Sequence, residues 1–156
     1  MKINIITIGK LKEDYWKQAE TEYLKRLTPY AKIEITELKE EKFDEKSNHE
    51  VIKKKEADKI IKAIPEDSYV IILDKKEHQF TSEELAEKIT QFTIKQLNNL
   101  TIVIGGPLGL HVSVLNLAKE KISFSKSTFT HQMIRIILLE QIYRAYMIKE
   151  GRKYHY

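Results

Sequence analysis

The chain has 156 residues, of which 42% are hydrophobic and 32% are charged, and its net charge is +4. These proportions are typical of a globular protein, and we expect a single domain over residues 1–156 with a cytoplasmic location. The chain has no cysteine, which excludes disulfide bonds and thiolate metal sites. No apolar run reaches the ~18 residues of a membrane span, and the N-terminus lacks a signal-peptide pattern.

Basic residues are concentrated toward the C-terminus. Residues 119–156 carry eight basic and three acidic side chains, whereas residues 1–118 are close to neutral. Three of the four arginines, Arg135, Arg144 and Arg152, lie in this last part of the chain. A basic end on a neutral body suggests a polyanionic partner such as nucleic acid. A lysine-rich surface that serves only solubility is the alternative.

Strands and helices are predicted to alternate along the first half of the chain. Residues 2–8 are almost wholly apolar, as in a strand that is buried on both faces. Apolar residues then recur at helical spacing from Tyr15 to Leu27, and Pro29 ends that helix. We expect a strand at 31–38, a charged loop at 39–50, a lysine-rich helix at 50–63 and a buried strand at 69–73.

The second half of the chain continues this alternation. After a turn at 74–80, Thr81 and Glu84 match a capping box that opens a helix through about Leu97. We then expect a buried strand at 101–104, a short helix at 111–118, a short strand at 122–124 and a helix from His131 to about Lys149. Strands that alternate with helices predict an α/β fold with a mainly parallel sheet and helices on both faces.

The last predicted helix is apolar around nearly its whole circumference. Its polar residues are few and fall at scattered angles, although one side of a surface helix normally faces water. A chain of 156 residues rarely surrounds a helix completely, so we favour self-association through this helix. A central helix within a large core is the alternative.

A glycine-rich turn follows the strand at 101–104. The run Gly105-Gly106-Pro107-Leu108-Gly109 holds three of the five glycines, which lets the backbone approach a ligand closely. Open α/β sheets bind ligands at the carboxyl ends of their strands. The run fits neither a phosphate loop nor G-x-G-x-x-G, and a purely structural turn is equally consistent with it. Leu73, at the end of another strand, is a candidate wall for a flat ring or a core leucine.

A second unusual loop precedes the last helix. The segment Phe124-Ser125-Lys126-Ser127-Thr128-Phe129 places small hydroxyl residues between two aromatic residues. Such a loop offers main-chain amides, carbonyls and hydroxyls at one place, although an ordinary connecting loop has the same composition. Together with the glycine turn, this segment indicates a ligand pocket formed largely by main chain.

These motifs together resemble those of the SPOUT methyltransferases over essentially the whole chain. More narrowly, the chain resembles the small branch that methylates N3 of a pseudouridine in large-subunit (23S) ribosomal RNA. The resemblance rests on the following motifs: Lys2-Ile3, Gly9-Lys10-Leu11-Lys12, Tyr15-Trp16, Glu22-Tyr23, Lys25-Arg26-Leu27, Pro29-Tyr30, Ile104-Gly105-Gly106-Pro107, Gly109-Leu110, Phe124-Ser125-Lys126, Thr128-Phe129, His131-Gln132-Met133, Arg135, Glu140-Gln141, Tyr143-Arg144-Ala145 and Tyr154-His155.

The resemblance implies a fold, a cofactor and a partner. It implies a SPOUT fold whose C-terminal part forms a trefoil knot, and a homodimer with the last helix at the interface and the tail of one subunit near the cofactor of the other. It implies S-adenosyl-L-methionine as methyl donor and no metal. By match of motif, the cofactor-binding residues are Leu73, Gly105, Phe124, Ser125, Lys126, Ser127, Thr128 and Phe129.

The C-terminal residues are the candidate catalytic and RNA-binding groups. A pseudouridine N3 must lose a proton before it can attack a methyl group, and His155 is our candidate base. Tyr154 would orient or stack on the nucleotide, although frayed chain ends are common. Arg135, Arg152 and Lys153 are expected to contact RNA or ribosome phosphates. Pairing with Glu140 or with a partner chain is the alternative for Arg135 and Arg144. We favour it for Arg144, since Glu140–Arg144 is an i,i+4 pair.

Two departures from the family pattern leave other functions open. This chain has Thr130 where relatives commonly carry proline, and it ends on Tyr156 where they end on arginine or lysine. Thr130 can still cap the following helix. A catalytically weakened dimer that binds RNA or the ribosome is therefore one alternative. A nucleotide-binding α/β protein with no RNA partner is another.

Overall fold

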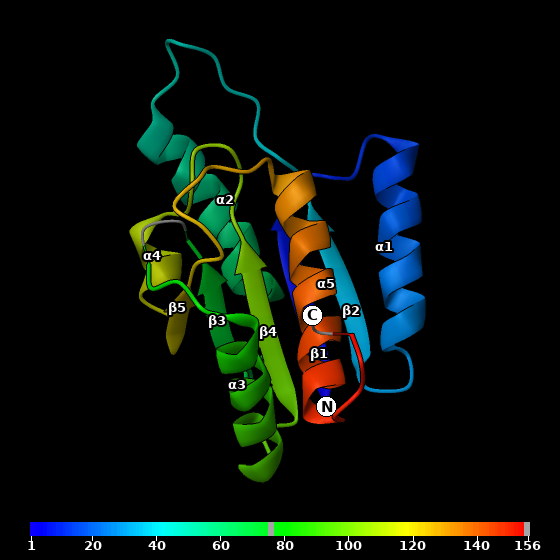
Figure 1. Cartoon of the computed structure of the whole chain (residues 1–156). Helices are drawn as coiled ribbons and strands as arrows, with labels where there is room; N and C mark the ends of the chain where they lie inside the picture. The colour runs from blue at the N-terminus through cyan, green and yellow to red at the C-terminus, as the bar shows by residue number, and fades with distance from the viewer. Residues whose placement is uncertain (75–76, 155–156) are drawn as a thin grey trace.

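The sheet is entirely parallel. The structure is a computed structural model that describes residues 1–74 and 77–154. Within these residues, five strands form one sheet in the order β2-β1-β4-β3-β5 (Figure 1). The strands are β1 (Lys2–Ile8), β2 (Lys32–Leu38), β3 (Tyr69–Leu73), β4 (Asn99–Ile104) and β5 (Glu120–Ile122). The predicted strand order along the chain and the α/β class are confirmed.

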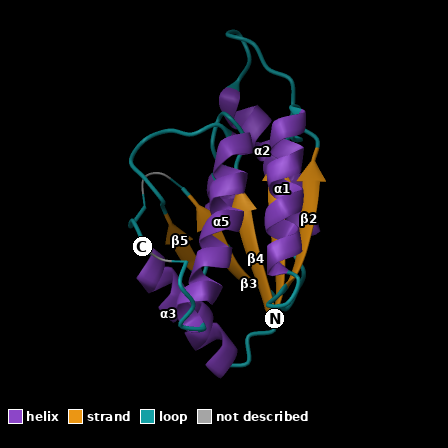
Figure 2. Ribbon diagram, turned by 45° about the vertical axis from the view of Figure 1, so that its right-hand side comes forward, coloured by secondary structure: helices purple, strands orange, loops and turns teal. Residues whose placement is uncertain are grey.

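Helices cover both faces of the sheet, as predicted. They are α1 (Asp14–Leu27), α2 (His49–Ala63), α3 (Ser82–Ile94), α4 (Val112–Leu115) and α5 (His131–Lys149). Ile3 and Ile5 of β1 belong to the core beneath α1, α3 and α5, whereas Ile6 and Ile8 belong to the core beneath α2 and α4. This alternation follows from the two-residue period of a strand. Figure 2 shows α1, α5 and α3 side by side on one face of the sheet.

Much of the apolar circumference of α5 packs within its own chain. The helix lies over the sheet between α1 and α3 (Figure 1), and of its 19 residues only Met133 and Lys149 are exposed. Eight of the 19 residues are buried within the chain and nine are partly buried. Packing within the chain therefore accounts for much of the apolar surface, and self-association through this helix stays a prediction.

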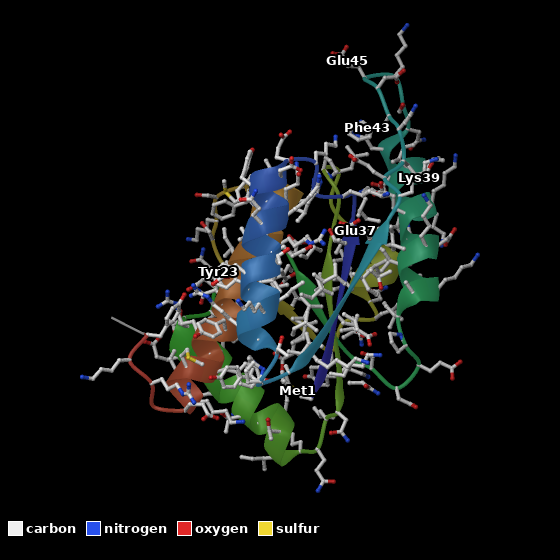
Figure 3. The ribbon with its side chains drawn as sticks, turned by 90° about the vertical axis from the view of Figure 1, so that its right-hand side faces the viewer. Met1, Tyr23, Glu37, Lys39, Phe43 and Glu45 are labelled. Atoms are coloured by element: carbon white, nitrogen blue, oxygen red, sulfur yellow. The ribbon has the colours of Figure 1, made fainter. Side chains whose placement is uncertain are left out.

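Several predicted boundaries shift for local reasons. The strand expected at 122–124 lies at Glu120–Ile122, where it pairs with the last three residues of β3. The helix expected to run to Leu97 ends at Ile94, because Gln96 has a φ of 54°, which a right-handed helix cannot accommodate. The capping box of Thr81 and Glu84 is confirmed. The charged loop before α2 projects beyond the sheet, with Phe43 and Glu45 near its far end (Figure 3).

Candidate active site

A cavity of about 1130 Å³ lies at the carboxyl ends of β3, β4 and β5. Because the strands are parallel, their carboxyl ends meet at one edge of the sheet, where open α/β folds bind ligands. The glycine turn after β4 and the hydroxyl-rich loop after β5 both line this cavity. The structure thus brings together the two segments that the sequence predicted to form one pocket. Leu73 also lines it, at the end of β3.

The glycine turn leaves no room for a side chain at Gly105, its first residue. A Cβ atom on Gly105 would lie 2.9 Å from Cγ of Leu110, closer than two carbon atoms approach without displacement. The turn is closed by the Gly109 N–H, which donates to the carbonyl oxygen of Gly106 at 3.0 Å. The main chain of this turn therefore forms part of the cavity wall itself.

The hydroxyl groups of the second loop fold it back on itself. Ser123 Oγ donates to the carbonyl oxygen of Ser125 at 2.9 Å, and Ser125 Oγ accepts from the Ser127 N–H at 3.0 Å. Seven of the eight predicted cofactor-binding residues line the cavity: Leu73, Gly105, Phe124, Ser125, Ser127, Thr128 and Phe129. Lys126 is the exception, since it is exposed and does not belong to the wall.

The first turn of α5 closes one side of the cavity and is held by the segment that follows β1. Thr130 caps the helix by accepting from the Met133 N–H at 3.2 Å, so the predicted capping role is confirmed. Gln132 Oε1 accepts from the Lys12 N–H at 2.7 Å. The His131 ring lies against Gly9, where a Cβ atom would come within 2.9 Å of Nε2. Both His131 and Gln132 line the cavity, and the sequence did not indicate this.

Arg135 is buried in an ion cluster and does not face solvent. Its side chain is 3% exposed and forms ion pairs with Glu20 of α1 and with Glu37 of β2, the latter at 2.7 Å. Glu37 lies on β2 (Figure 3). Burial raises the pKa of the Glu20 carboxyl despite the opposing effect of the Arg135 guanidinium. This placement corrects the expectation that Arg135 contacts RNA, because both carboxylates already hold the guanidinium inside the chain, and its partners are Glu20 and Glu37 instead of Glu140.

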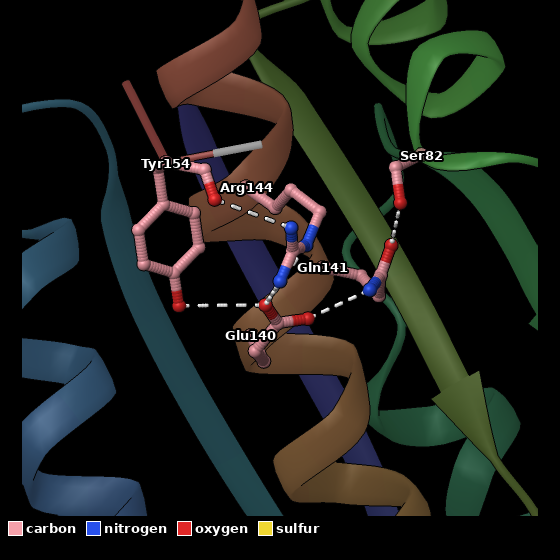
Figure 4. A network of polar contacts seen from close by, with 5 residues as sticks. All are labelled: Ser82, Glu140, Gln141, Arg144 and Tyr154. Carbon is pink, nitrogen blue, oxygen red and sulfur yellow. Dashed lines mark hydrogen bonds and ion pairs between the residues drawn. The ribbon is translucent and has the colours of Figure 1, made fainter. Parts of the chain in front are cut away.

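Arg144 and Tyr154 meet in a polar network on the middle of α5 (Figure 4). Arg144 donates to Glu140 Oε1 at 2.6 Å from Nη2, which confirms the predicted i,i+4 pair, and to the Tyr154 carbonyl oxygen at 3.4 Å. The Tyr154 hydroxyl donates to Glu140 Oε1 at 3.4 Å. Gln141 links Glu140 to Ser82 of α3, at 2.6 and 2.8 Å. The network thus fixes the end of the described chain against α5.

Tyr154 is held as a neutral phenol. Burial, followed by a hydrogen bond with Tyr23, raises the pKa of Tyr154 from 10.0 to about 12. Tyr154 does not line the cavity, and His155 lies outside the described residues. Arg152 and Lys153 are exposed, so both side chains can reach an external partner.

The charges of the cavity wall are mainly negative. Among the described residues that line it, Glu50, Asp74 and Glu77 carry carboxylates, and Lys53 is the single lysine or arginine. Glu50 and Lys53 come from α2, a contribution for which the sequence offered no signal. Such a wall favours a ligand with positive charge. The described residues include no group of three or more side chains arranged to hold a metal ion.

The fold and the cavity define a class of protein. A parallel α/β sheet with a main-chain-lined cavity at its carboxyl edge defines a small-ligand-binding α/β protein. The model of the family described as "Predicted SPOUT methyltransferase" matches residues 1–155. The chain therefore belongs to the SPOUT methyltransferase family.

Curated relatives match the chain from end to end. It is 51% identical to the "Ribosomal RNA large subunit methyltransferase H" of Clostridium novyi and 46% identical to that of Halothermothrix orenii. Each comparison spans 158 residues and covers 99% of both proteins.

One solved structure shares the fold of this chain. The structure of a probable methylase family protein from Haemophilus influenzae Rd KW20 has a TM-score of 0.56 at 16% identity. The match covers 99% of this chain and 70% of that chain, and it supports the fold alone.

None of the described helices combines the length and apolar character needed to cross a membrane.

Proposed function

We propose that this protein transfers a methyl group from S-adenosyl-L-methionine to N3 of a pseudouridine in large-subunit (23S) ribosomal RNA. The observation that carries the proposal is the cavity at the sheet edge, which combines main-chain loops with a negatively charged wall. The donor is a sulfonium cation and suits that charge. The names of relatives that match over 99% of their length support a ribosomal RNA acceptor.

The residues of the cavity suit the cofactor. The turn at Gly105 offers bare main chain, and Leu73, Phe124 and Phe129 offer apolar surface for an adenine ring. When bound, the cofactor supplies an electrophilic methyl group. The chain's own contribution is to orient the two reactants and to exclude water from the reacting atoms.

His155 is the proposed base and Tyr154 the residue that orients the nucleotide. A histidine with an ordinary pKa of ~6.5 can accept the N3 proton at neutral pH. A phenol whose pKa is about 12 cannot serve as base there, so Tyr154 is left with hydrogen bonding and stacking. Arg152 and Lys153, which are exposed, would contact RNA phosphates.

We further propose a homodimer in which each tail serves the cavity of the other subunit. Tyr154 is tied to Glu140, which follows His131 at the cavity wall by nine positions, or ~13 Å along a helix axis. A tail held there is offset from its own cavity, which favours delivery by a second copy. A C-terminal trefoil knot, a single domain over residues 1–156 and a cytoplasmic location belong to the same proposal.

The test is methyl transfer to ribosomes from cells that lack the gene. We expect purified protein to transfer one tritiated methyl group per large subunit, and mass spectrometry to find it on N3 of a pseudouridine. His155→Ala should lower turnover at least a hundredfold while leaving the dissociation constant for the cofactor unchanged. Cofactor binding without any transfer would instead support the alternative of an RNA- or ribosome-binding dimer.

A further inference from the structure

An ion pair on α2 contributes to the cavity but has no place in the function described so far. Lys53 Nζ pairs with Glu50 Oε1, one helical turn earlier, and both side chains line the cavity. The Lys53 side chain is only 20% exposed, whereas that of Glu50 is 68% exposed. Lys53 lowers the pKa of the Glu50 carboxyl through a hydrogen bond, which favours the carboxylate form of Glu50.

Apart from Lys53, the described residues of the cavity wall include no lysine or arginine to pair with a carboxylate. The residues proposed to hold the adenosyl part of the cofactor are uncharged, apart from Lys126, whose position lies outside the wall. Asp74 and Glu77 repel a carboxylate. Among the described residues of the wall, Lys53 is thus the one group with the charge to bind an anion. Its partial burial strengthens such a contact, because charges interact more strongly away from water.

S-adenosyl-L-methionine carries an ammonium group and a carboxylate on one carbon atom, at the end opposite its adenine. We propose that Glu50 and Lys53 bind this amino-acid group, with Lys53 donating to the carboxylate and Glu50 accepting from the ammonium. The inference rests on the proposed function. Exchange of the internal ion pair for two ion pairs to the ligand leaves no charge without a partner, which avoids the main cost of burying charges.

The test compares ligands from which these charges are removed in steps. Isothermal titration calorimetry with the purified full-length protein would use S-adenosyl-L-methionine, its decarboxylated analogue, which lacks only the carboxylate, and 5′-methylthioadenosine, which lacks the whole amino-acid group and the sulfonium charge. We expect the wild type to bind the first about tenfold more tightly than the second. Lys53→Gln should bind these two equally, and its affinity for 5′-methylthioadenosine should stay within about twofold of wild type.

Matched variants separate the contact from a general change of charge. Lys54→Gln removes the same charge from the neighbouring position, where the lysine pairs with Asp58 at 2.9 Å outside the cavity, and should keep the tenfold preference. Lys53→Arg should keep most of it. Glu50→Gln should weaken both ammonium-bearing ligands and leave 5′-methylthioadenosine unaffected. Thermal unfolding by circular dichroism would verify that each variant is folded.

The outcomes distinguish this inference from the function on which it rests. If Lys53→Gln keeps the wild-type preference, or weakens all three ligands equally, the inference is overturned and the cofactor cavity stands. If the wild type binds none of the three at millimolar concentration, the proposed function falls as well. If the preference disappears in Lys53→Gln alone among the lysine-to-glutamine variants, the contact is established.

Discussion

Arg135 and Arg144 both interrupt the apolar surface of α5, yet their guanidinium groups have very different surroundings. The side chain of Arg135 is 3% exposed and binds carboxylates from α1 and β2. That of Arg144 is 23% exposed and binds Glu140, in its own helix, and the carbonyl oxygen of Tyr154 in the tail. One arginine therefore ties α5 to the rest of the fold, and the other ties the tail to α5.

This difference separates residues that hold the cavity from residues that present the tail. Arg135 lies one turn after His131 and Gln132, which line the cavity and contact Gly9 and Lys12. A substitution that removes contacts at this end of α5 should lower stability and cofactor affinity together. A substitution that removes contacts at the Glu140–Arg144 end should lower turnover while leaving the cavity intact.

Arg135→Met gives the largest expected effect and tests the first half of this comparison. It leaves Glu20 and Glu37 beside a buried apolar side chain with no cation, which costs about 3–5 kcal/mol of unfolding free energy. Urea denaturation would measure the loss, and a midpoint for thermal unfolding lower by about 10 °C is expected. Adding Glu20→Gln and Glu37→Gln should recover part of the loss. A loss below about 1 kcal/mol would show that the cluster does not hold α5 in place.

Gly9→Ala tests the contact between the segment after β1 and the start of α5. Gly9 has a φ of +88°, and a Cβ atom there would lie 2.9 Å from Nε2 of His131. Gly151→Ala is the matched control, since Gly151 has a φ of +62° and no heavy atom within 4 Å of such a Cβ. We expect about 1 kcal/mol of destabilisation for the control and about 2 kcal/mol for Gly9→Ala.

The same pair of variants should separate the two effects in binding experiments. Calorimetry should show weaker cofactor binding for Gly9→Ala and unchanged binding for Gly151→Ala, because His131 lines the cavity. Equal destabilisation by both substitutions would mean that backbone strain alone explains the glycine at position 9.

The sequence predicted what depends on local pattern. The order of strands and helices, the capping residues Thr81 and Thr130 and the two loops at the sheet edge all follow from spacing and residue type. Parallel strands bring such loops together without further information, since their carboxyl ends share one edge. Seven of the eight residues expected to bind the cofactor accordingly line one cavity.

The sequence did not predict what depends on distant partners. Arg135 meets Glu37 across 98 positions, and unlike Arg144, which follows Glu140 by four residues, it has no acidic residue at helical spacing to indicate a partner. The contribution of Glu50 and Lys53 to the cavity depends on where α2 lies over the sheet, which periodicity does not report. Likewise, periodicity alone does not indicate how much of the apolar surface of α5 packs against α1 and α3, because that packing is a tertiary property.

Arg144→Gln tests the second half of the comparison and has a smaller effect on stability. The ion pair with Glu140 is partly exposed, so its loss should cost about 1 kcal/mol. Because this residue also holds the tail, we expect turnover to fall about tenfold with the dissociation constant for the cofactor unchanged. Lys149→Gln, which removes an exposed charge from the same helix, is the control. If Arg144→Gln weakened cofactor binding as much as it lowered turnover, the two ends of α5 would not have the separate roles inferred here.

Tyr154→Phe gives the smallest expected effect and sharpens the role of the tail. The hydroxyl contact with Glu140 is long, at 3.4 Å, and the other contact is a neutral hydrogen bond with Tyr23, so removal of the hydroxyl should cost less than about 1 kcal/mol near neutral pH. Because the pKa of Tyr154 is about 12 in the folded chain and 10.0 ordinarily, the phenol is neutral in both states below pH ~10. Its contribution to stability is therefore present below pH ~10 and is lost between pH ~10 and ~12, where only the unfolded chain ionises.

Two measurements follow from that titration. The pH dependence of unfolding should be shallower for Tyr154→Phe than for the wild type above pH ~10, and the two should run parallel below it. The pH profile of turnover between pH 6 and 9 should have the same shape in the variant as in the wild type, since Tyr154 does not titrate in that range. A profile whose basic limb moves in Tyr154→Phe would mean that the phenol, and not His155 alone, takes part in the proton transfer.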